Sequence, residues 1–338
     1  MKIKKEKIAS ISSGHDPLHI GLMGALAIML AAFLWAFDGV VLTPWVVDLG
    51  LSDIPTFVFM LHAVSSVFLS YYLFRKFKEL KNLDKKDWLA FGLTGFFGGA
   101  VGTMAIIAAI VQVYSEGLNI SVVLLLQKLQ PIFAILLAFI WLKERPRKIF
   151  YVWAAVALIG SYLLTFGLHS PDFKATGMFI PAMLAILAAF SFGSSTVFSK
   201  KAVAKINHGL STALRFFITT AIMLVIISVI ELLKSAGIET SYAGFSGFSA
   251  INWNLIGAFV VIALSTGGMA IFIYYWGLKK VLASRSTVYE MVFPVSAIIL
   301  EYFIHKQTLT AGQWLGAVIV FGAIWSILRL KKIDAQVE

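Results

Sequence analysis

The run at residues 121–145, SVVLLLQKLQPIFAILLAFIWLKER, is the feature that most constrains the fold of this chain. Its apolar part is about as long as the roughly 20 residues that a helix needs to cross a lipid bilayer. Gln127, Lys128 and Gln130 lie near its middle, beside Pro131. A lysine at the centre of a spanning helix costs about 2.5–3.5 kcal/mol on insertion scales. The run therefore predicts a transmembrane helix whose lysine faces a polar interior.

A second run, at residues 286–307, repeats this design as STVYEMVFPVSAIILEYFIHKQ. Pro294 stands in the place of Pro131, and Glu290 stands in the place of Gln127. Each proline removes one backbone hydrogen bond and frees a carbonyl group near the middle of the membrane. A hinge and a broken-helix binding site are both compatible with this pattern.

The rest of the chain has the composition of a multi-pass membrane protein. Of its 338 residues, 59% are hydrophobic and only 13% are charged, whereas soluble domains carry about 25% charged residues. Hydropathy windows of about 20 residues predict an all-α protein with ten spans, at 20–42, 54–74, 88–112, 118–141, 148–168, 177–199, 209–232, 254–277, 284–304 and 310–329. The apolar run from Ile20 is predicted to be an uncleaved first span, not a signal peptide.

The net charge of +11 lies on short loops between apolar spans, which argues against nucleic-acid binding. With the N-terminus placed in the cytoplasm, almost every loop lysine and arginine falls on the cytoplasmic side, and the outer loops hold only Lys174, Lys234 and Lys306. This asymmetry predicts that both termini are cytoplasmic. We expect a location in the inner or plasma membrane.

The two halves of the chain resemble each other in order. The sequence Ala31-Ala32-Phe33 matches Ala188-Ala189-Phe190, Gly102 to Ile106 match Gly267 to Ile271, and Gly160 matches Gly322. Five spans per half is an odd number, so the second half must be inverted in the membrane. The predicted organisation is a tail at 1–19, a five-helix repeat at 20–168, a second at 177–329 and a tail at 330–338.

Two motifs carry a resemblance to a known family: Leu34-Trp35-Ala36-Phe37 in the first span, and the spacing from Pro131 to Glu144. In both, the sequence resembles the EamA-type members of the drug/metabolite transporter superfamily. The degenerate copy from Pro294 to Gln307 and the duplicated five-span unit add to this likeness. The resemblance covers about residues 20 to 330. It implies a ten-helix transporter whose substrate path runs between the repeats. Gln307 departs from the glutamate that is common at its position.

Five ionisable residues lie inside the predicted spans and are candidates for substrate binding or coupling. We hypothesise that Lys128 and Glu290 pair in one state and exchange partners with substrate or a proton in another; a static structural ion pair is the alternative. Asp38 is either a buried proton carrier or a residue of the outer vestibule. His62 is either a titrating group or a satisfied core residue. Arg215 either holds a carboxylate or phosphate or reaches the interface.

Neutral and aromatic side chains complete the candidate site. Gln127 and Gln130 offer hydrogen bonds beside Lys128, while Trp35 and Tyr274 either line an apolar pocket or pack in the core. The glycine pairs in 98–102 and 312–316 predict close helix packing. Glu144, among cationic neighbours, is expected to form an ion pair within its loop.

These observations predict a secondary transporter that moves a small polar or amphiphilic metabolite, such as an amino acid, by alternating access. We expect export, with proton coupling through Glu290 or Asp38 as one option. No catalytic, metal-binding or nucleotide-binding motif is present in the sequence, so neither enzymatic activity nor a cofactor is expected. A lipid flippase or scramblase and a non-transporting membrane scaffold are the alternatives. The expected partners are the bilayer, a small-molecule substrate and protons.

Overall fold

The computed structural model describes residues 17–51, 53–118, 120–169, 177–237, 247–306 and 310–334. Within these residues there is no strand, and ten helical spans are long and apolar enough to cross a membrane. The predicted all-α fold with ten spans is confirmed. Lys174, Gln307 and most of the two predicted tails lie outside the described residues. The spans are Ile20–Asp48, Ile54–Asn82, Lys85–Val113, Leu125–Leu142, Lys148–Phe166, Phe179–Ala202, His208–Ser235, Trp253–Leu278, Ala283–Ile304 and Ala311–Leu330.

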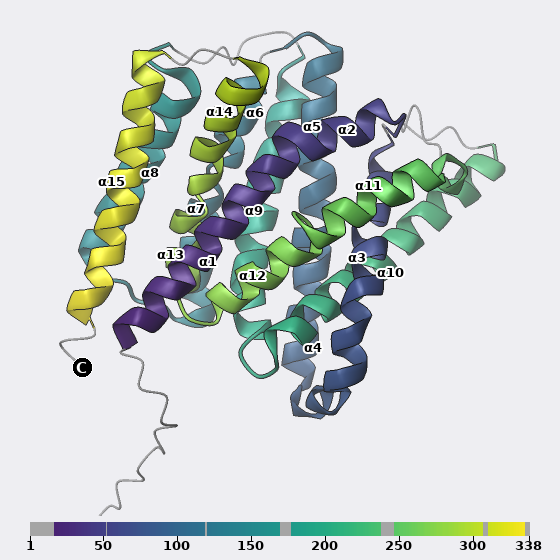
Figure 1. Ribbon diagram of the computed structural model, residues 1–338, viewed down its shortest axis with the longest axis horizontal. Coiled ribbons are helices and arrows are strands. Elements are labelled where there is room, and N and C mark those ends of the chain that lie inside the picture. The colour runs from purple at the N-terminus through teal and green to yellow at the C-terminus, as the bar shows by residue number, and fades with distance from the viewer. Residues whose placement is uncertain are drawn as a thin grey trace, which may run out of the picture.

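Several spans are built from more than one helical segment (Figure 1). The first half contains α1 (Pro17–Phe37), η1 (Asp38–Leu42), α2 (Thr43–Asp48), α3 (Ile54–Lys76), η2 (Phe77–Asn82), α4 (Lys85–Thr94), η3 (Gly95–Val101), α5 (Gly102–Ser115), α6 (Ile120–Gln127), α7 (Gln130–Leu137), η4 (Ala138–Leu142) and α8 (Lys148–Phe166). The second half contains α9 (Phe179–Ala202), α10 (His208–Ser235), η5 (Gly247–Ala250), α11 (Trp253–Leu264), α12 (Gly268–Leu278), α13 (Ala283–Tyr289), α14 (Val292–His305) and α15 (Ala311–Asp334).

The two halves pack against each other as inverted repeats. The first span of the first half, α1, packs on α12, α13 and α14, which belong to the third and fourth spans of the second half. The first span of the second half, α9, packs correspondingly on α5, α6 and α7. The second spans pair as α3 with α10, and the fifth spans pair as α8 with α15. This reciprocal packing places the space between the repeats at the centre of the bundle.

The fourth span of each repeat is broken at the same place. In the first, α6 ends at Gln127 and α7 begins at Gln130; in the second, α13 ends at Tyr289 and α14 begins at Val292. Pro131 and Pro294 lie in the first turn of the following helix, where a missing N–H is tolerated. Each proline ring clashes with the carbonyl four residues earlier, so a regular helix cannot run through the junction. Both prolines therefore mark broken helices, while their action as hinges stays a prediction.

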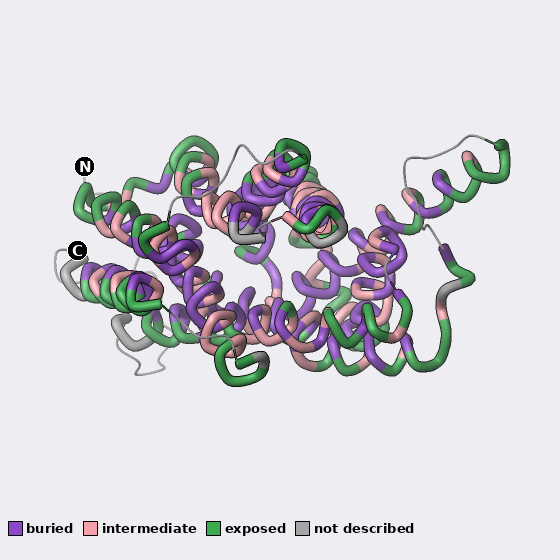
Figure 2. Tube along the Cα trace, turned by 90° about the horizontal axis from the view of Figure 1, so that it is seen from above, coloured by how far each residue is buried: buried purple, intermediate pink, exposed green. Residues whose placement is uncertain are grey.

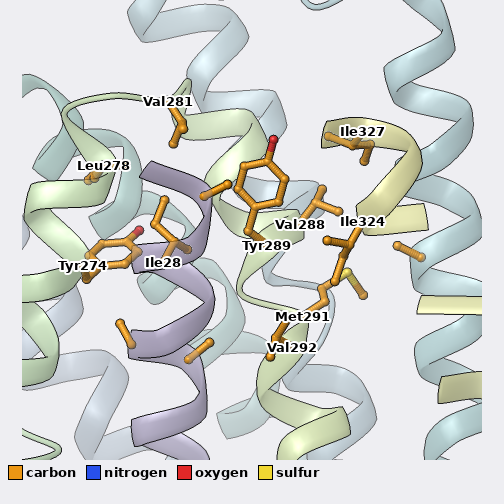
Figure 3. Close-up of a cluster of buried hydrophobic side chains, with 14 of the residues drawn as sticks. Ile28, Tyr274, Leu278, Val281, Val288, Tyr289, Met291, Val292, Ile324 and Ile327 are labelled. Atoms are coloured by element: carbon orange, nitrogen blue, oxygen red, sulfur yellow. The ribbon is translucent and has the colours of Figure 1, made fainter. Parts of the chain in front are cut away.

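The buried residues lie mostly in the interior of the bundle, and the exposed residues lie mostly around its rim (Figure 2). The largest core cluster joins α1, α12, α13, α14 and α15. In Figure 3, Ile28 from α1 lies between Tyr274 and Leu278 of α12 on one side and Tyr289 of α13 on the other, while Ile324 comes from α15. This cluster ties the first helix of one repeat to three spans of the other and holds Tyr274 in place.

Glycines allow the fifth spans to approach closely, as their spacing predicts. A Cβ atom on Gly316 would meet the backbone nitrogen of Leu164 and, at 2.7 Å, the carbonyl oxygen of Gly160. Gly160 itself faces the backbone of α15 at Val320. Its counterpart in the repeat, Gly322, has open space around it, so this pair of matched glycines does not share one packing role.

We call the end of the bundle that carries residues 75–86, 143–148, 200–205 and 279–285 the basic end. It lies at the lower edge of Figure 1, where α15 also ends. The helix junctions there hold most of the described lysines and arginines. The sequence predicts that this end faces the cytoplasm.

Candidate functional site

A cavity of about 310 Å³ lies between the repeats. Its volume is at the lower end of the range of roughly 300–1,000 Å³ that is typical of small-molecule sites. Every residue that the sequence singled out for binding or coupling, together with both prolines, lines this cavity. These residues are Trp35, Asp38, His62, Gln127, Lys128, Gln130, Pro131, Arg215, Tyr274, Glu290 and Pro294.

Glu290 lies at the helix break between α13 and α14 and joins the two repeats. Its Oε2 accepts a hydrogen bond from Gln130 Nε2 at 2.8 Å, and its Oε1 accepts one from the Tyr274 hydroxyl at 2.8 Å. The Tyr274 hydroxyl also lies 3.2 Å from Oγ1 of Thr196, and its ring packs 5.4 Å from Trp35, centroid to centroid. Both oxygens of Glu290 are thus held by neutral partners.

Asp38 is held by two hydroxyl groups in the same cavity. Thr266 Oγ1 donates to Oδ1 at 2.6 Å, and Thr43 Oγ1 donates to Oδ2 at 3.1 Å. Thr266 lies where α11 and α12 separate, so a third broken span provides this contact. Asp38 therefore lines the cavity between the repeats as a carboxylate with neutral partners, like Glu290.

Arg215 brings a largely buried positive charge into the cavity. Its residue is only 9% exposed, and its terminal nitrogen donates to the Tyr275 hydroxyl at a long 3.3 Å. Its Nε has no hydrogen-bond partner among the described residues. Leaving a buried donor unsatisfied costs about 1–3 kcal/mol. The role of Arg215 in binding a substrate stays a prediction of the sequence.

Among the described residues, the His62 side chain makes one hydrogen bond, through its Nδ1 atom. Its Nδ1 lies 2.8 Å from the Val58 carbonyl oxygen, which can only accept, so this nitrogen carries the proton. The ring packs 5.1 Å from that of Phe216, centroid to centroid. The other nitrogen, Nε2, is then an acceptor in a wall of the cavity.

Lys128 does not pair with Glu290 in this structure. Its Nζ donates to Gln127 Oε1 at 3.3 Å and lies 4.1 Å from the centre of the Phe293 ring. Gln130, two residues further along the chain, takes the place at Glu290 that was predicted for Lys128. Pairing of Lys128 with Glu290 in another state stays a prediction.

The cavity also contains residues that the sequence argument missed. In the sequence, a serine or threonine that lines a cavity looks the same as one that packs two helices together. A phenylalanine that lines a cavity likewise looks the same as one that faces lipid. Of the missed residues, Thr266 alone had a signal, because it belongs to the STGG sequence at 265–268, which is unusual inside an apolar span and indicates a helix break. The missed residues include Thr43, Phe192, Ser195, Thr196, Ser199, Phe216, Thr266 and Phe293.

Glu144 forms no ion pair within its loop, so that expectation is wrong. Its carboxylate accepts hydrogen bonds from the backbone nitrogens of Ala283 at 2.8 Å and Ser284 at 3.0 Å, and from the Ser284 hydroxyl at 2.6 Å. These groups begin α13, whose first N–H groups lack partners within the helix. The contact therefore clamps the basic end of one repeat onto the broken span of the other.

Within the described residues, no group of three or more acidic or histidine side chains is arranged to hold a metal ion. The cavity instead combines aromatic walls with separate donors and acceptors. Such a lining suits an organic molecule that has a flat apolar part and several polar groups.

Comparison with known proteins supports this description. The sequence matches the EamA-like transporter family twice, over residues 22–166 and 179–329. It is 39% identical over 319 residues to a Fusobacterium nucleatum protein named riboflavin transporter ImpX, covering 93% of this chain and 99% of that protein. It is 26% identical to the uncharacterized transporter sll1164 of Synechocystis, covering 74% and 68%. A solved crystal structure shares the fold with a TM-score of 0.64 at 16% identity, covering 90% of this chain and 94% of that one.

Proposed function

The chain belongs to the EamA-like transporter family, and from this premise we propose that it carries riboflavin or a close flavin relative across the membrane. Transport is by alternating access, with the flavin bound in the cavity between the repeats. The observation that carries the proposal is the 39% identity, over nearly the whole of both chains, to a protein named as a riboflavin transporter.

The lining of the cavity supports a flavin as cargo. Riboflavin has a flat three-ring system with a polar edge of carbonyl groups and ring nitrogens, and a ribityl chain that carries hydroxyl groups. Trp35, Phe192 and Phe293 offer aromatic surfaces for the rings. Thr196, Gln127 and other polar residues of the wall offer partners for hydroxyl groups.

Arg215 is the residue that we assign to the polar edge of the flavin. A guanidinium group presents several donors in one plane, which suits two neighbouring acceptors. The buried, poorly satisfied state of Arg215 favours a ligand that supplies such acceptors. The uncharged flavin edge offers them without bringing a second formal charge into the cavity.

Glu290 is the residue that we assign to proton coupling. Its carboxylate lies at the junction of the repeats and is bonded to neutral groups of both, through Gln130 and Tyr274. Protonation would weaken its two accepted hydrogen bonds and thereby favour separation of the repeats at this point. Because the sequence carries no nucleotide-binding loop, an ion or substrate gradient must drive transport.

The remaining expectations belong to the same proposal. We place the basic end in the cytoplasm and the chain in the plasma membrane, on the lysine and arginine distribution. An amino-acid cargo and export stay predictions of the sequence, and the flavin proposal rests on the relative and on the cavity. The same assay measures the direction of net flux.

The test is flux into liposomes that contain the purified chain and a pH-sensitive dye. Riboflavin is followed by its own fluorescence, and amino acids, amines and organic acids are tested as competitors. We expect saturable riboflavin flux with a pH change in the wild type. In Glu290→Gln, riboflavin exchange should persist while the pH change is lost. Glu301→Gln, the same substitution on the same span but outside the cavity, is the matched control and should behave like the wild type.

Each contrary outcome points to a different function. Flux of an amino acid that riboflavin neither shares nor inhibits would overturn the flavin proposal. Movement of labelled phospholipid without riboflavin flux would favour a scramblase. If the folded protein moves nothing in any arm, a scaffold role gains support. A pH change that survives in Glu290→Gln would remove the coupling role from Glu290 and direct attention to Asp38.

A further inference from the structure

We propose that His62 and Arg215 together recognise an imide edge of the cargo, in which an N–H group stands between two carbonyl groups. Arg215 donates to one of the carbonyl oxygens, and His62 Nε2 accepts the hydrogen bond from the imide N–H. This assignment rests on the proposed function, because the ring system of riboflavin carries such an edge, with the imide nitrogen at N3. His62 thereby becomes a residue that determines which ring systems the cavity accepts.

His62 and Arg215 lie in corresponding spans of the two repeats. His62 belongs to α3 and Arg215 to α10, the second spans, which pack against each other. The His62 ring packs 5.1 Å, centroid to centroid, from the ring of Phe216, the residue that follows Arg215. His62 is also close enough to Arg215 to interact with its charge, and both side chains line the central cavity. One ligand in the cavity can therefore contact both.

His62 offers an acceptor to this ligand. Its Nδ1 donates to the Val58 carbonyl oxygen at 2.8 Å, so in the neutral ring Nε2 is the nitrogen that accepts. Nε2 has no hydrogen-bond partner in the part of the chain that the structure describes. The residue is only 4% exposed, and a buried polar atom that stays unpaired costs free energy. A donor on the ligand, such as an imide N–H, would satisfy it.

Arg215 offers donors beside this acceptor. Its Nη1 donates to the Tyr275 hydroxyl at 3.3 Å, while neither Nε nor Nη2 has a hydrogen-bond partner among the described residues. Gly98 leaves room for the guanidinium group, since a Cβ atom at that position would lie 3.1 Å from Nη2. A donor from Arg215 and an acceptor from His62 complement a carbonyl group that stands next to an N–H group.

The charge balance of the cavity favours an uncharged edge over an anion. The charged side chains that line it are two acidic and two basic ones, Asp38, Glu290, Lys128 and Arg215. Glu290 lies within electrostatic reach of Arg215, so the guanidinium group already has an acidic neighbour. A carboxylate or phosphate at Arg215 would bring a second negative charge near Glu290, and like charges repel strongly in a buried site. An imide supplies hydrogen-bond donors and acceptors without a charge.

The test compares riboflavin with N3-methylriboflavin, in which a methyl group replaces the imide hydrogen. The ligand control is 5-deazariboflavin, which keeps the imide edge and lacks the ring nitrogen N5. Binding to the purified full chain in nanodiscs is measured from the quenching of riboflavin fluorescence, and the two analogues are measured by displacement of riboflavin. His62→Phe keeps a ring of similar size and removes the acceptor. His208→Phe is the matched control, because His208 also packs on a phenylalanine, 4.5 Å from the ring of Phe272, but does not line the central cavity.

We expect the wild type to bind N3-methylriboflavin about tenfold or more weakly than riboflavin, which is the effect of a lost hydrogen bond that leaves a buried group unpaired. In His62→Phe, riboflavin should bind about tenfold more weakly. Its advantage over N3-methylriboflavin should disappear there, because the acceptor is gone while the volume of the ring remains. 5-Deazariboflavin should follow riboflavin in every protein, and His208→Phe should behave like the wild type.

Each contrary result has its own meaning. Equal binding of riboflavin and N3-methylriboflavin to the wild type would overturn the role of His62, and this comparison does not depend on the folding of a variant. A preference for riboflavin that persists in His62→Phe would show that the methyl group is excluded by its size alone, which also overturns that role. An equal loss in His208→Phe would do the same. If the wild type binds no riboflavin, the proposed function itself fails, and the imide site fails with it.

Discussion

The clamp that Glu144 forms on α13 makes the sharpest prediction about stability. Glu144→Ala removes the acceptor for two buried backbone N–H groups, those of Ala283 and Ser284. Each buried donor that is left unsatisfied costs about 1–3 kcal/mol. The Ser284 hydroxyl can rotate to another acceptor and is left out of the sum. We therefore expect the free energy of unfolding to fall by about 2–6 kcal/mol.

Glu144→Gln should lie between the wild type and Glu144→Ala. The amide keeps one acceptor oxygen but turns an NH₂ group toward the second backbone N–H, so one of the two hydrogen bonds is lost. Glu116→Ala is the control, because Glu116 is an exposed carboxylate bonded only to Gln112 among the described residues. A change of less than about 0.5 kcal/mol is expected there.

The assay is reversible unfolding in mixed micelles, in which a denaturing detergent is titrated while circular dichroism and tryptophan fluorescence are recorded. The expected loss for Glu144→Ala is a large part of the roughly 5–15 kcal/mol that stabilises a folded domain, so it should be readily measured. If Glu144→Ala and Glu116→Ala unfold alike, the contact between the repeats does not contribute to stability, and the reasoning is refuted.

Three further changes test other parts of the structure. Gly316→Ala should lower the free energy of unfolding by about 1–3 kcal/mol, because the new Cβ atom would meet the backbone of α8. Gly322→Ala, on the same helix but in open space, should leave the free energy of unfolding unchanged. Equal effects of the two substitutions in the same unfolding assay would contradict this packing. The Lys205 ammonium holds the pKa of Asp84 at about 2. The pair therefore stabilises the fold fully when the pH is above the ordinary pKa of a carboxyl group, and this stabilisation is lost as the pH falls toward the lowered pKa. The stability gap between wild type and Lys205→Met should therefore narrow from about pH 4 to about pH 2; a constant gap would refute the pairing. Arg215→Gln should raise the KM for riboflavin about tenfold or more, and an unchanged KM with normal folding would remove Arg215 from the site.

The fold was largely predictable because the bilayer imposes strong local rules. A span needs about 20 apolar residues whatever its neighbours are, so the ten spans could be counted directly. The repeat of Pro131 as Pro294 correctly marked two equivalent interruptions, since a proline disrupts the same backbone bond wherever it occurs in a helix. Ionisable residues inside spans must avoid lipid, and for this reason Asp38, Lys128 and Glu290 were all found at one cavity.

The partners of these residues were not predictable. Asp38 meets Thr266 across 228 positions of sequence, and Glu290 meets Gln130 across 160. Lys128 was the more obvious partner for Glu290 by charge, yet the break between α6 and α7 presents Gln130 instead. A shift of two residues at a helix break changes which side chain faces the cavity, and hydropathy does not encode that rotation.

By itself the sequence determined the number and order of the spans and which ionisable residues avoid lipid, because these follow from the transfer of each segment into the bilayer. The tertiary structure alone decided that Glu144 accepts hydrogen bonds from the first N–H groups of α13 in the other repeat, and that the Arg215 Nε lies in a cavity without a partner among the described residues. It also gathered Lys200, Lys279, Lys280 and Arg285, from two separate segments, around one hollow at the basic end. Such contacts depend on how helices distant in sequence rotate and pack, and only their three-dimensional arrangement settles that.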